Sequence, residues 1–168
     1  MQRALFLKST VLKSTVLFVC SVMWSLNVFA ASPNDEVTAP VVKFLDSFNK
    51  GDIKAAAATH TEKGIVIIDE VAPYLWQGHD SFKNWLADLG KHDKARGITD
   101  GKVTLGPVTR VEVEGNRAYV VYPSAYTFKQ KGVAMKEAAQ MTFAMKKTPS
   151  GWRINGWSFT GPTPTPGQ

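Results

Sequence analysis

Hydrophobic residues recur at helical spacing in two segments of the chain. In each segment the apolar side chains fall at positions i, i+3, i+4 and i+7 or close to them, which is the spacing of one face of an α-helix. Thr38 is placed to cap the helix of the first segment, and Asn49-Lys50-Gly51 ends it. The helix of the later segment, which is the third along the chain, begins at Asp80 or Ser81. The two apolar stripes consist of Val41, Phe44, Leu45 and Phe48 in the first segment and of Phe82, Trp85, Leu86 and Leu89 in the second.

A shorter helix and a buried strand are predicted between these two segments. Asp52 can cap a helix that runs through the four alanines at 55–58, and Gly64 interrupts the chain after it. The apolar run 65–68 then indicates a buried strand that ends in Asp69-Glu70. Residues 73–78 are expected to form a loop before the next helix.

Long β-strands are predicted from Lys102 onward. Two short polar segments containing glycine are typical of hairpin turns, and Gly106-Pro107 and Pro123 require a bend or bulge within a strand. Strands of this length cannot stay flat. The pattern therefore predicts an α+β fold in which three N-terminal helices pack on a strongly curved antiparallel sheet. The predicted strand runs are 102–114, 116–129, 133–147 and 152–160.

The first 30 residues have the pattern of a secretory signal peptide. A basic stretch up to Lys13 precedes an uncharged run from Ser14 to Ala30, and the run closes with Val28-Phe29-Ala30. The uncharged run is too short for a spanning helix, so we expect cleavage, export and no stable membrane anchor. Cys20 is the only cysteine, and its removal with this peptide would leave the mature chain without disulfides or thiolate metal ligands. The remaining chain divides into a polar lead at 31–36, a domain at 37–160 and a Pro/Thr-rich tail at 161–168 that is expected to fray.

The net charge of the chain does not indicate a nucleic-acid partner. The sequence holds 20 basic and 14 acidic residues, but three of the basic ones, Arg3, Lys8 and Lys13, belong to the expected signal peptide. The remaining charges of both signs are interspersed, so no basic stripe could follow a phosphate backbone.

Three short motifs in this order resemble the SnoaL-like and ketosteroid-isomerase-like families of the nuclear transport factor 2 superfamily. The resemblance covers residues 37–160 and implies a cone-shaped fold with an internal pocket. Members often pair through their sheets, so it also implies a homodimer. The motifs are Phe44-x3-Phe48-Asn49-x-Gly51-Asp52-Ile53, Gly78-His79-Asp80-Ser81-Phe82 and Gly151-Trp152-Arg153-Ile154.

The resemblance argues against ketosteroid isomerase activity itself. Asp69 falls within one residue of the family's catalytic base. The positions of its two oxyanion donors fall on Phe44 and near Met141, and neither side chain can donate a hydrogen bond to an oxyanion. Asp69 is either a general base at the edge of a cavity or a strand-end carboxylate in water.

Other candidate residues lie on the loop before the third helix and on the predicted strands. Tyr74 and Trp76 could stack on a planar ligand, and His79 could orient or protonate it; alternatively Trp76 fills the core and His79 lies beside the helix cap. His60 and His92 are expected to be ordinary surface histidines. The full set consists of Asp69 and His79 as catalytic candidates and Phe44, Tyr74, Trp76, Tyr122, Tyr126, Met141 and Trp157 as ligand-binding candidates.

Several chemistries lack their motifs. The sequence contains no G-x-S-x-G, phosphate-loop, G-x-G-x-x-G or H-E-x-x-H pattern. We therefore expect neither a cofactor nor a metal site.

Three functions remain open from the sequence. The first is binding of a small, largely apolar molecule between helices and sheet without strong catalysis. The second is a lyase, isomerase or cyclase that uses Asp69 as general base, and the third is a protein-interaction domain that uses the outer sheet face.

Overall fold

The computed structural model describes residues 33–167. The expected signal peptide at 1–30 and the start of the polar lead lie outside the described residues. Within 33–167, no helix has both the length and the apolar character needed to cross a membrane.

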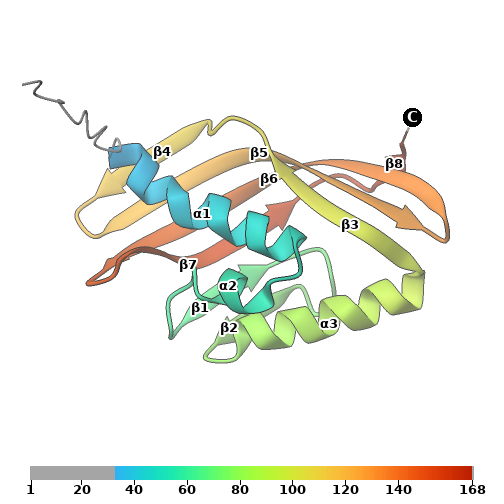
Figure 1. Cartoon of the computed structure of the whole chain (residues 1–168), viewed down its shortest axis with the longest axis horizontal. Coiled ribbons are helices and arrows are strands. Elements are labelled where there is room, and N and C mark those ends of the chain that lie inside the picture. The colour runs from blue at the N-terminus through green and yellow to red at the C-terminus, as the bar shows by residue number, and fades with distance from the viewer. Residues whose placement is uncertain (1–32, 168) are drawn as a thin grey trace, which may run out of the picture. The chain divides into compact units, whose positions relative to one another are not determined.

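Helices α1 and α2 and strands β3 to β7 form two layers, with α1 and α2 on one face of a long, twisted sheet, and α3 lies along the same side (Figure 1). The three helices, the strand at 65–68 and the long C-terminal strands follow the sequence prediction in order. The predicted loop at 73–78 is wrong, because it contains strand β2, and the predicted run 102–114 is divided into β3 and β4. The elements are α1 (Pro33–Asn49), α2 (Ile53–Ala57), β1 (Ile65–Ile68), β2 (Leu75–Gly78), α3 (Ser81–Arg96), β3 (Ile98–Leu105), β4 (Arg110–Glu114), β5 (Arg117–Gln130), β6 (Val133–Thr148), β7 (Gly151–Thr160) and β8 (Thr165–Pro166).

Of two predicted helix caps, the structure contradicts Thr38 and confirms Asp52. Helix α1 begins at Pro33, so the prediction that Thr38 caps it is wrong. The Thr38 hydroxyl instead donates to the carbonyl of Asn34 within the helix, at 2.9 Å. The prediction for Asp52 is confirmed, because its Oδ1 accepts a hydrogen bond from the backbone N–H of Ala55 at 3.0 Å.

The sheet is mixed, whereas the sequence pattern predicted an antiparallel one. Its strand order is β2-β1-β7-β6-β5-β3, with β4 paired to β5 and β8 paired to β6. Strand β1 runs parallel to β7, and the other strand pairs are antiparallel. Parallel neighbours need a crossover between them, and here residues 69–150 lie between β1 and β7. This long-range pairing has no local sequence signal.

The two predicted bends share one structural cause. Residues Gly106-Pro107 separate β3 from β4, which pair one after the other with the same side of β5. Pro123 lies on β5 at this changeover, and its carbonyl accepts from the Gly106 N–H at 2.8 Å. Proline lacks a backbone N–H, so a break in the neighbouring strand is where it disturbs the ladder least.

The core between helices and sheet is built around a group of aromatic rings that we call the aromatic cluster, defined by Phe44, His60, Phe82, Trp85 and Trp157. The Phe44 and His60 rings meet edge to face at 4.8 Å between centroids, and Trp85 and Trp157 do so at 5.0 Å. Such edge-to-face contacts are a favourable packing of aromatic rings. The cluster joins α1, the segment after α2, α3 and β7 in one interior.

The C-terminal tail does not fray as expected. Strand β8 pairs with β6, with Thr165 opposite Lys136 and Pro166 opposite Met135. The Gly167 N–H donates to the carbonyl of Ala134 at 2.9 Å. The prediction from composition was wrong because β6 extends beyond β7 and offers the tail an unpaired backbone edge.

Candidate functional site

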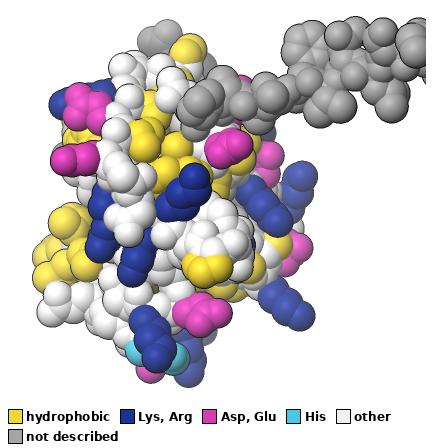
Figure 2. Space-filling view, turned by 90° about the vertical axis from the view of Figure 1, so that its left-hand side faces the viewer, with side chains coloured by type: hydrophobic (Ala, Val, Ile, Leu, Met, Phe, Trp, Pro, Cys, Tyr) yellow, Lys and Arg dark blue, Asp and Glu magenta, His cyan; other side chains and the backbone are white. Residues whose placement is uncertain are grey.

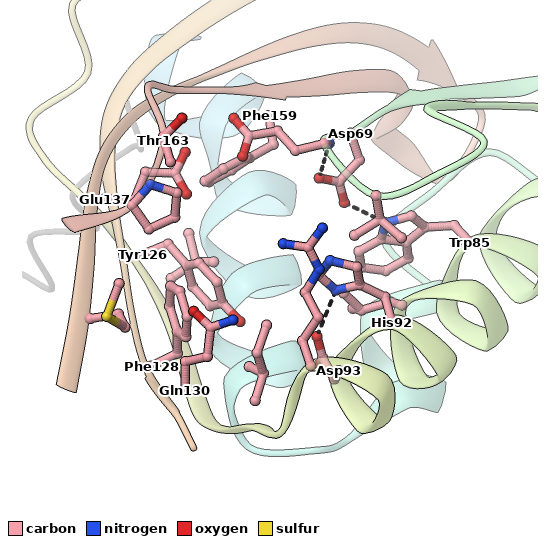
Figure 3. Close-up of a pocket in the computed structure, with 18 of the residues that line it drawn as sticks. Asp69, Trp85, His92, Asp93, Tyr126, Phe128, Gln130, Glu137, Phe159 and Thr163 are labelled. Atoms are coloured by element: carbon pink, nitrogen blue, oxygen red, sulfur yellow. Dashed lines mark hydrogen bonds and ion pairs between the residues drawn. The ribbon is translucent and has the colours of Figure 1, made fainter. Parts of the chain in front are cut away.

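A cavity of about 260 Å³ lies between the C-terminal part of α3 and the sheet (Figure 3). Its walls come from α1, α3, β3, β5, β6, β7, the segment after β1 and the C-terminal tail. Apolar and aromatic side chains make up most of the lining. The lining residues are Phe48, Asp69, Glu70, Val71, Trp85, Leu89, His92, Asp93, Arg96, Ile98, Val103, Tyr126, Phe128, Gln130, Met135, Glu137, Phe159, Thr163 and Pro164.

Asp69 enters the cavity wall directly after β1 and is held by two short hydrogen bonds. Its Oδ2 accepts from the indole N–H of Trp85 and its Oδ1 from the backbone N–H of Glu70, both at 2.6 Å (Figure 3). Burial raises the pKa of Asp69 above its ordinary value, although the Trp85 and Glu70 hydrogen bonds oppose that shift. A partly buried carboxylate oriented in this way is suited to accept a proton.

Glu137 on β6 is the most deeply buried acidic residue of the cavity, with 2 % of its surface exposed. Its carboxyl forms a hydrogen bond with the carboxyl of Glu70. Two carboxyls can share such a bond only when one of them carries a proton. Burial, followed by the negative charge of Glu70, raises the pKa of Glu137 to about 8, so Glu137 is the one that holds the proton at neutral pH.

The end of helix α3 supplies a second polar group of the cavity. Helix α3 continues to Arg96 and ends at Gly97, whose φ of 66° is the left-handed conformation of a helix C-cap. His92 therefore lies on the cavity side, partly buried, with its Nδ1 3.2 Å from Asp93 Oδ1. The prediction that His92 is an ordinary surface residue was wrong because it assumed an open end rather than a helix packed along the sheet.

Tyr126 on β5 lies directly beside Glu137, its register partner on β6, in the sheet wall of the cavity. Its ring stacks on Phe128 at 4.6 Å and meets Phe159 edge to face. The ring also lies against Gly101, where a β-carbon would come within 2.8 Å of the Tyr126 hydroxyl. Burial, followed by the negative charges of Asp93, Asp69 and Glu137, raises the pKa of the Tyr126 hydroxyl well above its ordinary value.

The structure brings two of the nine predicted site residues to the cavity, namely Asp69 and Tyr126. Two others lie on the surface: Tyr74 has 61 % of its area exposed, and the exposed His79 side chain contacts Asp80. Trp76 is buried and its indole N–H donates to Asp88 at 3.1 Å. The five predicted residues that are buried in the packed core, outside the set that lines the cavity, are Phe44, Trp76, Tyr122, Met141 and Trp157.

His60 is buried in the aromatic cluster, so the prediction that it is a surface histidine was wrong. Its Nε2 accepts from the Trp157 indole N–H at 3.2 Å, which leaves the proton on Nδ1, and Nδ1 lies 3.1 Å from the carbonyl of Ala56. Burial lowers the pKa of His60 to about 4. Both ring nitrogens therefore have partners in a neutral imidazole.

Glu137 is the cavity residue that sequence reasoning missed, although the sequence carried a signal. On β6 the apolar face is formed by alternate residues, and Glu137 falls on the same alternation, between Met135 and Ala139. A carboxyl on an apolar strand face is either paired or functional. Within residues 33–167, no three histidine, cysteine or acidic side chains are arranged to hold a metal ion.

Solved structures similar to this chain have the same fold. A ketosteroid isomerase-like protein from Erwinia carotovora atroseptica is 23% identical with a TM-score of 0.59, and the match covers 76% of this chain and 95% of that one. A nuclear transport factor 2-like superfamily protein from Salmonella enterica is 18% identical with a TM-score of 0.62, covering 77% and 90%. A type 2 hexachlorocyclohexane dehydrochlorinase is 11% identical with a TM-score of 0.65, covering 80% and 88%.

A search of curated proteins gives no match. The family model of the SnoaL-like domain matches residues 37–162, which is most of the chain. Together with the cone-like packing of helices on a mixed sheet, this match confirms the resemblance found in the sequence. The chain belongs to the SnoaL-like domain family.

Proposed function

We propose that this chain binds a small, largely apolar molecule in the cavity between α3 and the sheet. The observation that carries the proposal is the cavity of about 260 Å³, whose wall is mostly apolar and aromatic. Protein interiors pack closely, so an apolar hollow of this size is suited to a ligand.

A neutral aromatic probe tests this proposal. We expect 2-phenylethanol to bind saturably at one site per chain, measured by calorimetry. Val103→Phe places a ring at the cavity wall and should weaken binding at least about tenfold. Val113→Phe makes the same change on the exposed side of β4 and serves as the matched control. Absence of saturable binding, or equal weakening by both variants, would contradict the proposal.

Proton-transfer catalysis is a second candidate function, favoured by the position of Asp69. The carboxyl of Asp69 faces the cavity with a raised pKa, and the Tyr126 hydroxyl lines the same space. Asp69 would act as the base of a lyase, isomerase or cyclase, with Tyr126 as the acid in place of the distant His79. Deuterium exchange next to the carbonyl of enolisable ketones measures this step. Asp69→Asn should abolish the exchange, whereas Asp80→Asn on the surface should not.

An outer apolar patch, defined by Val66, Ile68, Tyr74 and Leu75, favours self-association as a further proposal. These side chains are between 38 % and 61 % exposed, and Ile68 and Leu75 lie opposite each other on β1 and β2. Figure 2 shows hydrophobic side chains gathered at the edge of one face of the molecule. We propose that the patch contacts a second copy or another protein. Light scattering of Leu75→Lys against the parent chain tests it, and an unchanged mass would exclude this patch as the contact between copies.

Export is proposed on the N-terminal sequence alone. The basic stretch and the apolar run end at Ala30, so the secreted or periplasmic protein should begin at Ala31. N-terminal sequencing of protein recovered from each cell fraction tests this, and an intact Met1 in the exported fraction would contradict cleavage.

A further inference from the structure

A second hollow, which we call the adjoining hollow, lies beside the proposed ligand cavity. It has a volume of about 320 Å³ and is enclosed by residues of α1, α3 and β3 and by the start of α2. The cavity and the adjoining hollow have six lining residues in common, and these residues form the wall between them. The shared residues are Phe48, Leu89, Asp93, Ile98, Val103 and Tyr126.

Tyr126 is the part of this wall that comes from the middle of the sheet. Its register partner on the edge strand β3 is Val103, but its hydroxyl lies against Gly101, two residues earlier on the same strand. The ring therefore leans across β3 toward the adjoining hollow, which Gly101 also lines. Phe128, which stacks on the ring at 4.6 Å, lines the cavity and supports the ring in this position (Figure 3).

A β-bulge in β3 makes room for the leaning ring. The pairing of β3 with β5 shifts between Thr99 and Lys102, so that Asp100 and Gly101 together fall opposite Phe128. Asp100 has a left-handed φ of 57°, a conformation found in one common class of bulge. Bulges often lie next to functional sites, where they redirect a side chain.

Gly101 is the bulge residue whose lack of a side chain fixes the position of the ring. A β-carbon there would come within 2.8 Å of the Tyr126 hydroxyl and 3.2 Å of its ring carbon Cε2. The backbone of Gly101 is outside the left-handed region, so glycine provides space here rather than a special conformation. A side chain at this position would push the Tyr126 ring away from β3 and into the cavity.

We propose that Tyr126 determines which ligands the cavity accepts, because its ring closes the cavity against the adjoining hollow. The inference rests on the proposed small-molecule binding and names the class of molecule bound, which is a compact molecule built on one ring and without a long chain. The cavity of about 260 Å³ is small for a ligand site, since such sites commonly measure about 300–1,000 Å³. Gly101 is a positioning residue that acts through the Tyr126 ring.

Two alcohols with the same phenyl ring and different chain lengths test the wall. They are 2-phenylethanol and 5-phenylpentan-1-ol, and each methylene that a ligand buries raises its affinity by up to about fourfold. We expect the parent chain to bind the longer alcohol no more than about threefold more tightly in calorimetry, because the wall leaves its extra methylenes in water. A greater preference for the longer alcohol overturns this inference and leaves the proposed function standing. Binding of neither alcohol overturns both.

Removal of the ring should join the cavity to the adjoining hollow. Tyr126→Ala should raise the affinity for 5-phenylpentan-1-ol about tenfold or more relative to that for 2-phenylethanol. Tyr119→Ala removes an exposed tyrosine from the opposite face of the same strand and should leave the ratio of the two affinities unchanged. Tyr126→Leu keeps part of the apolar side chain and is judged by the same ratio if the alanine variant does not fold. An unchanged ratio in the variant that folds overturns the inference.

The close approach at Gly101 gives an independent test. Gly101→Ala should push the Tyr126 ring into the cavity and weaken the binding of 2-phenylethanol about fivefold or more. Adding Tyr126→Phe to that variant removes the nearest contacting atom and should restore most of the affinity. Gly106→Ala is the matched control, because it crowds the Pro123 ring at 3.1 Å at a position that lines neither the cavity nor the adjoining hollow. Equal affinities in the two alanine variants, or no recovery in the double variant, overturn the role of Gly101.

Discussion

His60 and Glu137 are both buried titratable side chains on the helix side of the same sheet, but the protein treats them differently. Burial lowers the pKa of His60 to about 4 and raises that of Glu137 to about 8, so both are neutral at pH 7. His60 lies in the aromatic cluster with a partner for each ring nitrogen. Glu137 lies at a cavity and keeps an oxygen without a partner among the described residues.

The difference separates a polar group that is satisfied in the packed core from one that is left unsatisfied beside a cavity. A satisfied polar group in a packed core fixes local geometry and needs nothing further. An unsatisfied group beside a cavity lowers the stability of the folded protein. A protein is expected to keep such a group where function requires it. If this interpretation is correct, changes in the aromatic cluster should affect folding, and changes at the cavity should affect binding more than folding.

The largest expected effect comes from removing a ring of the aromatic cluster. Phe44→Ala should lower the free energy of unfolding by about 3–5 kcal/mol, because it removes a fully buried ring and leaves a void. Phe128→Ala is the matched change at the cavity wall and should cost about 1–3 kcal/mol, since part of that ring already faces empty space. Urea denaturation measures both, and equal losses would break the distinction between packed core and cavity.

The second effect concerns the pH dependence of stability through His60. Its pKa is about 4 in the folded protein against an ordinary value of 6.5, so the folded protein binds fewer protons than the unfolded chain between these values. His60 therefore makes stability fall as pH decreases through this window, by about 2.5 kcal/mol at pH 4.5. We expect His60→Gln to reduce the difference in unfolding free energy between pH 7.5 and pH 4.5 by about that amount.

The exposed His79 provides the control for that measurement. His79→Gln removes a histidine whose side chain is 75% exposed, and it should leave the pH dependence unchanged. If His60→Gln has as little effect as His79→Gln, His60 is not held neutral by the core.

The third effect is a stabilising one at the cavity. The pKa of Glu137 is raised from 4.5 to about 8, so the folded protein holds a proton that the unfolded chain releases, and stability falls as pH rises from 4.5 to 8. Glu137→Gln keeps a neutral side chain that can donate to Glu70, and should therefore raise the unfolding free energy at pH 8 by about 1 kcal/mol or more. Below pH 4.5 the two proteins should be equally stable. A loss of stability at pH 8 would instead make Glu137 a structural group like His60.

The residues of the packed core could be predicted from the sequence better than the residues that line the cavity. The two helical stripes could be predicted because helix periodicity is local, and Phe44, Trp85 and Leu45 lie in the core as that periodicity requires. Asp69 could be predicted because it directly follows a short apolar strand. Glu137 was not predicted, since period-two alternation shows which residues share a face but not which of them border a void.

The C-terminal tail illustrates the same limit. Its proline and threonine content predicted fraying, yet Thr163 and Pro164 line the cavity and Thr165 pairs with β6. The pairing depends on the length by which β6 exceeds its neighbour, and that length results from tertiary structure rather than from the composition of the tail.

The smallest expected effect concerns Gly161, where the C-terminal tail passes the carboxyls of Glu70 and Glu137. A β-carbon at Gly161 would lie 3.1 Å from the Glu137 carboxyl carbon and 3.2 Å from the Ala138 carbonyl oxygen, closer than side-chain carbons normally approach. Gly161→Ala should therefore displace the tail, weaken the hydrogen bond from the Gly161 N–H to Glu70, and lower the unfolding free energy by about 1 kcal/mol. Gly90→Ala, in the exposed middle of α3 with free space around it, should instead raise it by about 0.5–1 kcal/mol. The Gly167 amide donates to the Ala134 carbonyl, and its hydrogen exchange should accelerate only in Gly161→Ala. The same exchange rate in both variants would show that the tail pairs with β6 independently of its contact with the cavity.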